Sequence, residues 1–227
     1  MPGDVSDALA DLARAFAAAH VRWYVFGAQA VAAAGVPRFT ADIDVTVELP
    51  RTGVRELLSV LASHGFAMRD VGDVTTFIAE TRVVPVDHVA SQMPVDIVLA
   101  GPGLEEEMLQ RVRVHRIGGR QIPFIDTADL VALKMLAGRP KDLEDVRGLV
   151  RARPASLSLE VARSRVGDLA AMVDDSTLLT TLDRIIREES AEPRPGRAPS
   201  APRKPAPKPV KKATGRRGRA SRRPRRR

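Results

Sequence analysis

Residues 38–47 read RFTADIDVTV, and this stretch decides which fold we expect. From Asp42 onward polar and apolar side chains alternate, which is the pattern of a strand with one buried face. Residues two apart on a strand point to the same face, so Asp42 and Asp44 place two carboxylates side by side. Ile43 and Val45 then point into the core. Two anions this close repel each other unless a cation lies between them.

Oxygen ligands at this density suit Mg²⁺, which binds one or two protein carboxylates together with phosphate oxygens and water. A third carboxylate from a neighbouring strand would complete a two-metal site. Asp96 fits because it is the only charged residue in an otherwise apolar strand predicted at 95–99. Asp87, in the strand predicted at 83–88, is the competing candidate.

A strand and a helix are expected directly before this stretch. Residues 21–26 are β-branched and aromatic, and the alanine-rich sequence after Gly27 favours a helix. A helix start preceded by glycine offers backbone N–H groups and a positive dipole end to a phosphate. Gly27 and Ala28 are therefore candidates for a phosphate site, although Gly27 also suits a simple tight turn.

The remaining pattern divides the chain into a mixed half and a helical half. Further helices are expected at residues 5–19, 52–63, 127–137, 142–151, 159–173 and 176–189. Further strands are expected at residues 75–80, 83–88 and 95–99, with a hairpin formed by 111–116 and 121–125. The predicted organisation is an α/β core over 1–125, a helical region over 126–189 and a tail over 190–227.

The tail differs from the body in charge. Residues 191–227 hold fifteen of the 36 Lys and Arg residues but one of the 28 acidic residues, so the remaining body is net negative. Proline, lysine and arginine dominate the tail, and we expect it to be disordered because it has little apolar surface to bury. Its cations could neutralise nucleic-acid phosphates without regard to sequence. A solubilising extension is the alternative.

Composition excludes several other classes of site. The absence of cysteine rules out disulfides and cysteine-based zinc sites, and the four histidines have no metal-ligand spacing. No apolar run approaches the roughly 20 residues of a membrane span. We therefore expect a soluble, cytoplasmic protein with no membrane partner.

Four motifs together resemble the nucleotidyltransferase superfamily. They are Gly27-Ala28 at a strand end, RFTADID at 38–44, the lone strand residue Asp96, and LKMLAGRPKDLED at 133–145. Within the superfamily, the chain is most similar to AbiEii/MenT-like toxin nucleotidyltransferases, over roughly residues 21–151. The resemblance implies the minimal nucleotidyltransferase fold, a mixed β-sheet flanked by helices, followed here by a helical region and the tail.

The resemblance also implies roles for individual residues. Asp42 and Asp44 would bind Mg²⁺, and Asp96 would complete the metal site and help deprotonate an acceptor hydroxyl. Gly27 would line the phosphate site. Lys134 would contact nucleotide phosphates, although a lysine on a helix is as often simply solvated.

Other motif residues carry weaker implications. Arg38 and Thr40 belong to the nucleotide-binding motif, or they only shape the loop before Asp42. Many members of the superfamily have serine or a second glycine where this chain has Ala28, which keeps the backbone N–H but removes a hydroxyl. The later basic-acidic motif of the family is matched by Lys141, Asp142 and Asp145.

The resemblance implies transfer of a nucleoside monophosphate from an NTP, such as ATP, to an acceptor hydroxyl, with Mg²⁺ and release of pyrophosphate. The acceptor would be a tRNA 3′ end or a protein, and an antitoxin protein would restrain the enzyme. Two alternatives remain open. One is a catalytically silent RNA-binding module with the same fold, and the other is a small-molecule nucleotidyltransferase acting on an antibiotic.

Overall fold

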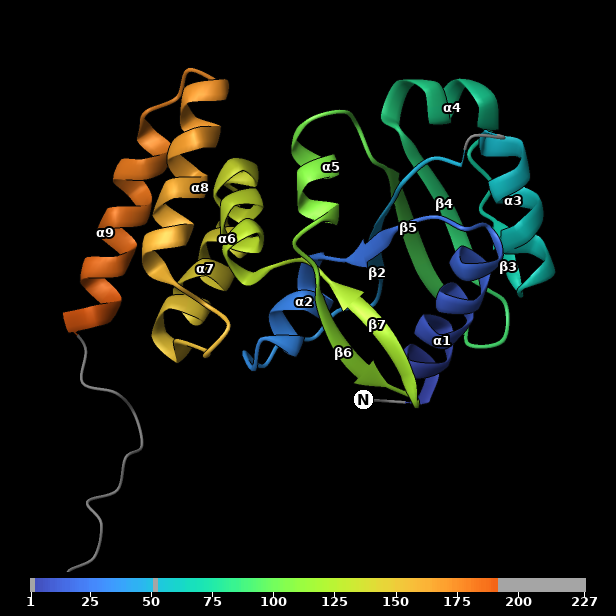
Figure 1. The fold of residues 1–227 in the computed structure, drawn as a ribbon, viewed down its shortest axis with the longest axis horizontal. Helices are drawn as coiled ribbons and strands as arrows, with labels where there is room; N and C mark the ends of the chain where they lie inside the picture. Colours follow the sequence, from blue (N-terminus) through green and yellow to red (C-terminus); the bar gives the residue numbers. More distant parts are fainter. Residues whose placement is uncertain (1–2, 51–52, 192–227) are drawn as a thin grey trace, which may run out of the picture. The chain divides into compact units, whose positions relative to one another are not determined.

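The computed structural model describes residues 3–50 and 53–191. Its centre is a seven-stranded mixed sheet with the strand order β3-β4-β5-β2-β1-β7-β6 (Figure 1). The strands are β1 (Trp23–Val25), β2 (Ile43–Val47), β3 (Phe66–Met68), β4 (Val83–His88), β5 (Met93–Leu99), β6 (Arg113–Ile117) and β7 (Arg120–Phe124). The mixed α/β sheet flanked by helices confirms the predicted fold class. The tail predicted at 190–227 lies outside the described residues from 192 onward.

Strand β2 is the middle of the sheet. It pairs antiparallel with β1 and parallel with β5, and the parallel register sets Asp44 directly beside Asp96. A parallel pair needs a crossover connection, which residues 48–92 supply through α3, β3, α4 and β4. Two residues distant in sequence therefore become lateral neighbours.

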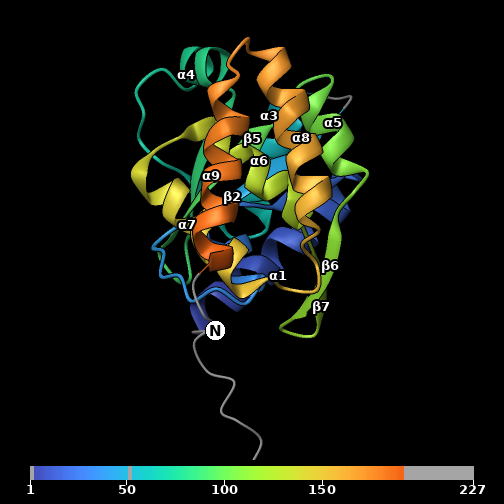
Figure 2. The same ribbon diagram turned by 90° about the vertical axis from the view of Figure 1, so that its left-hand side faces the viewer.

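Nine helices are found among the described residues. They are α1 (Gly3–Ala18), α2 (Gly27–Ala33), α3 (Val54–Ser63), α4 (Val74–Thr81), α5 (Leu104–Leu109), α6 (Thr127–Ala137), α7 (Pro140–Ala152), α8 (Leu159–Met172) and α9 (Thr177–Ala191). Helices α1 and α3 contact each other and the sheet, while α6 to α9 pack together at its other end (Figures 1 and 2). None of the described helices combines the length and the apolar character that a membrane crossing requires.

The apolar core fixes the face on which the carboxylates lie. Ile43, Val45 and Val47 of β2 are completely buried. Asp44 projects to the opposite face, as the alternation predicted. One apolar cluster runs from α1 through the sheet to α9, and the boundary predicted at residue 126 stays a prediction.

Several local predictions were wrong. Residues 75–80 form helix α4 and not a strand, because the Asp73 carboxylate accepts hydrogen bonds from the backbone N–H groups of Thr75 and Thr76 and caps the helix start. The β-branched residues of this segment had suggested a strand. Strand β3 and helix α5 were missed, since each is very short. The predicted strand 42–47 begins one residue later, at Ile43.

Candidate active site

Three carboxylates predicted from the sequence face one pocket. Asp44 on β2 and Asp96 on β5 are register partners, and Asp42 lies in the bend just before β2. All three line an open pocket of about 290 Å³. The sheet therefore brings Asp42 and Asp44 together with Asp96, which lies some fifty positions later in the sequence, as predicted.

Gly27 lies against the Asp44 side chain. Its φ is +63°, and a Cβ at this position would lie 1.9 Å from the Asp44 Oδ2 atom. The preceding Phe26 N–H donates to the Asp44 carbonyl over 2.9 Å, which holds the junction of β1 and α2 on β2. Glycine is required here for its left-handed backbone and for its lack of a side chain. Gly27 and Ala28 both line the pocket.

The loop before Asp42 contributes two further lining residues. The Thr40 hydroxyl donates to the Asp42 carboxylate and so orients it. Arg38 turns toward the helical region, where its Nε donates to Asp145 Oδ1 over 2.9 Å. Both residues line the pocket, and their predicted contacts with nucleotide stay predictions.

The charges of Asp42 and Asp44 are not balanced by a close arginine or lysine of the described residues. Burial raises the pKa of Asp44 to about 6, with a further upward contribution from the negative charges of Asp42 and Asp96. The positive charges of Lys134 and Lys141 act in the opposite direction and lower the pKa of Asp44. The β2 end of the pocket therefore attracts cations.

Lys134 has a different environment. It is only 8% exposed, and its Nζ donates to Asp142 Oδ1 over 2.9 Å and to Asp145 Oδ2 over 2.7 Å. Arg139 Nε donates to the second Asp142 oxygen over 2.5 Å. We call this set, with Arg38, the charge network. It joins α6, α7 and the loop before β2, and its members Arg38, Lys134, Arg139 and Asp142 line the pocket.

Two cations of the pocket wall were not assigned a role by sequence reasoning. Lys141 and Arg139 lie at the start of α7 and line the pocket. The Lys141 side chain is exposed and has no ion pair with any carboxylate in the described part of the chain. The sequence RPKD at 139–142 could have indicated these residues. Proline favours the first turn of a helix, so Pro140 places Arg139 and Lys141 at the start of α7.

The chemistry of this donor set fits a hard divalent cation, since it offers carboxylate oxygens around an uncompensated negative charge. As they stand, however, no three acidic or histidine side chains of the described ranges converge closely enough to hold an ion. The Asp96 carboxylate accepts a hydrogen bond from Arg69 Nη2. The pair formed by Asp42 and Asp44 has no such partner from an arginine or lysine in the described residues.

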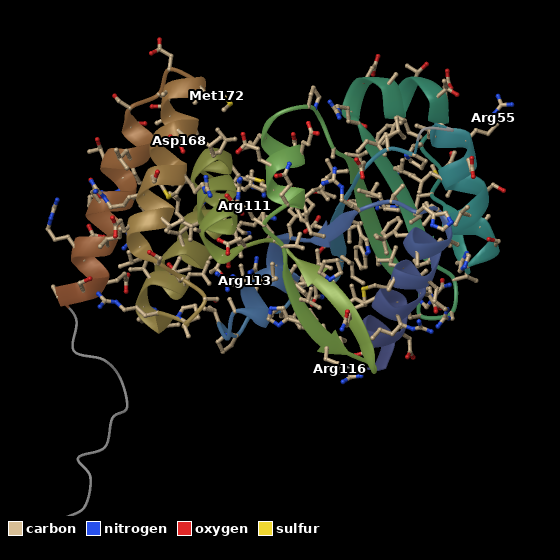
Figure 3. All side chains as sticks on the ribbon, viewed as in Figure 1. Arg55, Arg111, Arg113, Arg116, Asp168 and Met172 are labelled. Carbon is tan, nitrogen blue, oxygen red and sulfur yellow. The ribbon has the colours of Figure 1, made fainter. Side chains whose placement is uncertain are left out.

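Asp87, the competitor of Asp96, lies on β4 opposite Pro94 and is not among the residues lining the pocket. A second pocket lies between α5, α6 and α8, near Arg111, Asp168 and Met172 (Figure 3). Its buried carboxylate, Asp129, is satisfied by Arg111 at 2.9 Å and Arg165 at 3.3 Å. Asp129 therefore links secondary-structure elements and, being paired itself, is not available for chemistry.

One solved structure shares this fold. The solution structure of the antibiotic-resistance factor ANT(2'')-Ia aligns with a TM-score of 0.53 and 14% identity, over 77% of this chain and 95% of that chain. An antigenic nucleotidyltransferase-like protein from Paracoccidioides brasiliensis aligns with a TM-score of 0.48 and 13% identity, over 79% and 94% of the two chains. No curated protein matches the chain.

A family assignment comes from the sequence itself. Residues 5–186 match the family described as nucleotidyl transferase of unknown function (DUF2204). The match covers nearly all the described residues and includes every predicted site residue. It confirms the prediction of a nucleotidyltransferase, and the chain belongs to this nucleotidyl transferase family.

Proposed function

We propose that the chain transfers a nucleoside monophosphate from an NTP to an acceptor hydroxyl and releases pyrophosphate. The observation that carries this proposal is the lateral register of Asp44 with Asp96, with Asp42 at the mouth of the same pocket. A pocket lined by three carboxylates and by the cations Arg139 and Lys141 suits a reaction that is mostly positioning and charge stabilisation.

Asp42 and Asp44 would hold Mg²⁺, which when bound neutralises phosphate oxygens of the nucleotide. Thr40 keeps the Asp42 carboxylate oriented through its hydroxyl hydrogen bond. Asp96, beside Asp44 and 38% exposed, would accept the proton of the acceptor hydroxyl. The acceptor would therefore approach from the β5 side of the pocket.

The opposite wall would bind the phosphates. Lys141 and Arg139 line the pocket from the first turn of α7. Lys141 has the freer ammonium group, whereas Lys134 is held by two aspartates. We therefore assign the predicted phosphate contact first to Lys141, with Lys134 supporting the wall.

For the acceptor we keep the predicted classes, a tRNA 3′ end or a protein hydroxyl. The similarity of the sequence motifs to AbiEii/MenT-like toxins supports a role as the toxin of a toxin–antitoxin pair, with an antitoxin protein as partner and the cytoplasm as its site of action. The basic residues of 191–227 would add salt-sensitive affinity for RNA. Because ANT(2'')-Ia shares the fold, antibiotics belong in any panel of acceptors.

The test is a label-transfer assay with Mg²⁺, each of four α-labelled NTPs, and tRNA, total protein or aminoglycosides as acceptors. We expect label on RNA or protein, and none with the Asp42→Ala/Asp44→Ala or Asp96→Ala variants. Asp87→Ala is the matched control and should remain active. Label on aminoglycosides alone would assign the small-molecule alternative. If the folded protein transfers no label and shows no Mg²⁺-dependent NTP binding, the catalytically silent RNA-binding module is favoured.

A further inference from the structure

Arg69 reaches the candidate site from the edge of the sheet. It directly follows β3, and its backbone N–H donates to the Pro85 carbonyl over 3.0 Å. Pro85 is in turn the register partner of Asp96. The Arg69 guanidinium extends across this one strand, and its Nη2 donates to Asp96 Oδ1. The contact thus joins two strands that are not neighbours.

The rest of the guanidinium is poorly satisfied. Its Nε atom is buried and has no hydrogen-bond acceptor. The nearest other carboxylate oxygen, Oδ1 of Asp87, lies 3.9 Å from this nitrogen. An unsatisfied buried donor is unfavourable, so the position of Arg69 depends mainly on Asp96. Both side chains of the pair are about one-third exposed, which leaves the pair open to exchange.

Arg69 therefore occupies the place that a cation would take on Asp96. Asp96 lines the pocket together with Asp42 and Asp44, whereas Arg69 contacts Asp96 and is not among the lining residues. A positive charge held on Asp96 weakens the attraction of the site for a further cation. With Arg69 on Asp96, the three carboxylates form no group that could hold a metal ion in the described residues.

We propose that Arg69 is a positioning residue that holds Asp96 apart from Asp42 and Asp44, so that a divalent cation without substrate binds only the β2 pair. The inference rests on the proposed function, because that function identifies the three carboxylates as one site. With Arg69 on Asp96, a cation meets only the β2 pair. When Asp96 leaves Arg69, the third carboxylate becomes available to the cation and to the acceptor hydroxyl.

The experiment measures Mn²⁺ binding to the full chain by calorimetry and by loss of the free-Mn²⁺ paramagnetic resonance signal, without nucleotide or acceptor. The variants are Arg69→Gln, Arg69→Lys, Asp96→Asn and the Arg69→Gln/Asp96→Asn double variant. Arg55→Gln is the matched control, because it removes one positive charge from an exposed side chain on α3 that points away from the sheet (Figure 3).

We expect Arg69→Gln to bind Mn²⁺ roughly tenfold more tightly than the wild type, since a unit charge a few ångströms away has been removed. Arg69→Lys keeps the charge and should bind like the wild type, as should Arg55→Gln. Asp96→Asn should change little in the wild-type background and should abolish the gain in the double variant. Comparing Asp96→Asn in the wild-type background with the double variant separates a role through Asp96 from a general effect of charge.

Equal affinity of Arg69→Gln and wild type would overturn the proposal, and so would the absence of Mn²⁺ binding by both. If Arg69→Gln does not fold, Asp96→Asn decides alone: a large loss of Mn²⁺ affinity with Arg69 present would show that Asp96 already binds the cation. The assay contains no nucleotide, so a chain that binds Mn²⁺ as expected but transfers no label would contradict only the proposed function.

Discussion

Two groups of carboxylates lie in or next to the same pocket, and they differ in the cations that neutralise their charges. Asp142 and Asp145 on α7 are both almost fully buried, and Lys134 contacts both of them within 3 Å. Burial raises the pKa of Asp142, but hydrogen bonds from Arg139 and Lys134 outweigh it and hold the pKa below its ordinary value. At Asp44 burial and its acidic neighbours act together, and the pKa rises to about 6.

The difference separates acids that hold the fold together from acids available for chemistry. A buried carboxylate with cations from its own chain is part of the scaffold, and removing its partner leaves an uncompensated charge. A carboxylate without such a partner is destabilising until a cation from solution binds. The two groups should therefore respond in opposite ways to substitution, and each variant below tests that contrast.

The largest effect is expected for Asp44→Asn. Transfer activity should fall by about 10³-fold or more, because a neutral amide binds a divalent cation much more weakly than a carboxylate does. The charge on the transferred phosphoryl group would then lack the cation that stabilises it. The free energy of unfolding in EDTA should stay unchanged or rise by about 1 kcal/mol, because one of three like charges is removed. Label transfer and urea unfolding measure the two quantities. A variant that is less stable but fully active would show that Asp44 stabilises the fold and takes no part in the reaction.

Lys134→Met should have the opposite signature. Removing the ammonium group leaves Asp142 and Asp145 without their shared partner, and the free energy of unfolding should fall by about 3–5 kcal/mol. Lys134→Arg, which keeps the charge, should recover part of this loss. Urea unfolding measures both variants. A Lys134→Met protein of wild-type stability with a raised KM for NTP would instead support the phosphate contact that the sequence predicted.

The pH dependence of stability provides a second test of the charge network. Because the folded-state pKa of Asp142 is lowered, the unfolded state binds more protons at acidic pH. The stabilisation is present above the ordinary aspartate range and is lost as pH falls through the folded-state pKa. Stability of the wild type should therefore decrease on acidification below about pH 4. Lys134→Met should lose less over the same interval, and an equal loss in both proteins would exclude Asp142 as the source.

Local signals in the sequence were enough for much of this architecture. The alternation after Asp42 correctly predicted that Asp44 faces away from the core. Helix α6 has the predicted bounds because Asp126 caps its start and Gly138, with φ of +61°, ends it. The hairpin of β6 and β7 was recognisable from its Gly118-Gly119 turn.

Contacts between distant elements could not be predicted in the same way. The pairing of Arg69 with Asp96 depends on β3 lying two strands from β5, and β3 has only three residues. Lys134 was ambiguous because its partners are on the next helix, so its burial follows from how α6 packs on α7. The strand predicted at 75–80 was wrong because the Asp73 side chain caps helix α4, and this cap outweighed the β-branched composition of the segment.

Gly27→Ala tests whether the close approach of the Gly27 backbone to the Asp44 carboxylate matters for metal binding. The new Cβ would lie 1.9 Å from Asp44 Oδ2, so the carboxylate must turn away, and alanine is strained at φ of +63°. We expect a loss of about 1–2 kcal/mol in the free energy of unfolding and weaker Mn²⁺ binding. Gly35→Ala, also at positive φ but with open space around it, is the matched control for backbone strain alone. Equal Mn²⁺ affinity in both variants would show that the close approach to Asp44 has no role in metal binding.

Lys141→Ala should have the smallest effect, confined to one kinetic quantity. The side chain is exposed and lines the pocket, so the free energy of unfolding should change by less than about 0.5 kcal/mol. The KM for NTP should rise about tenfold, because one charge-assisted contact with phosphate is lost. Arg116→Ala, on strand β6 and outside the residues that line the pocket, is the control for net charge (Figure 3). A rise in KM equal to that of Arg116→Ala would return the phosphate contact to Lys134, and the cation held within the charge network would then serve both the fold and the substrate.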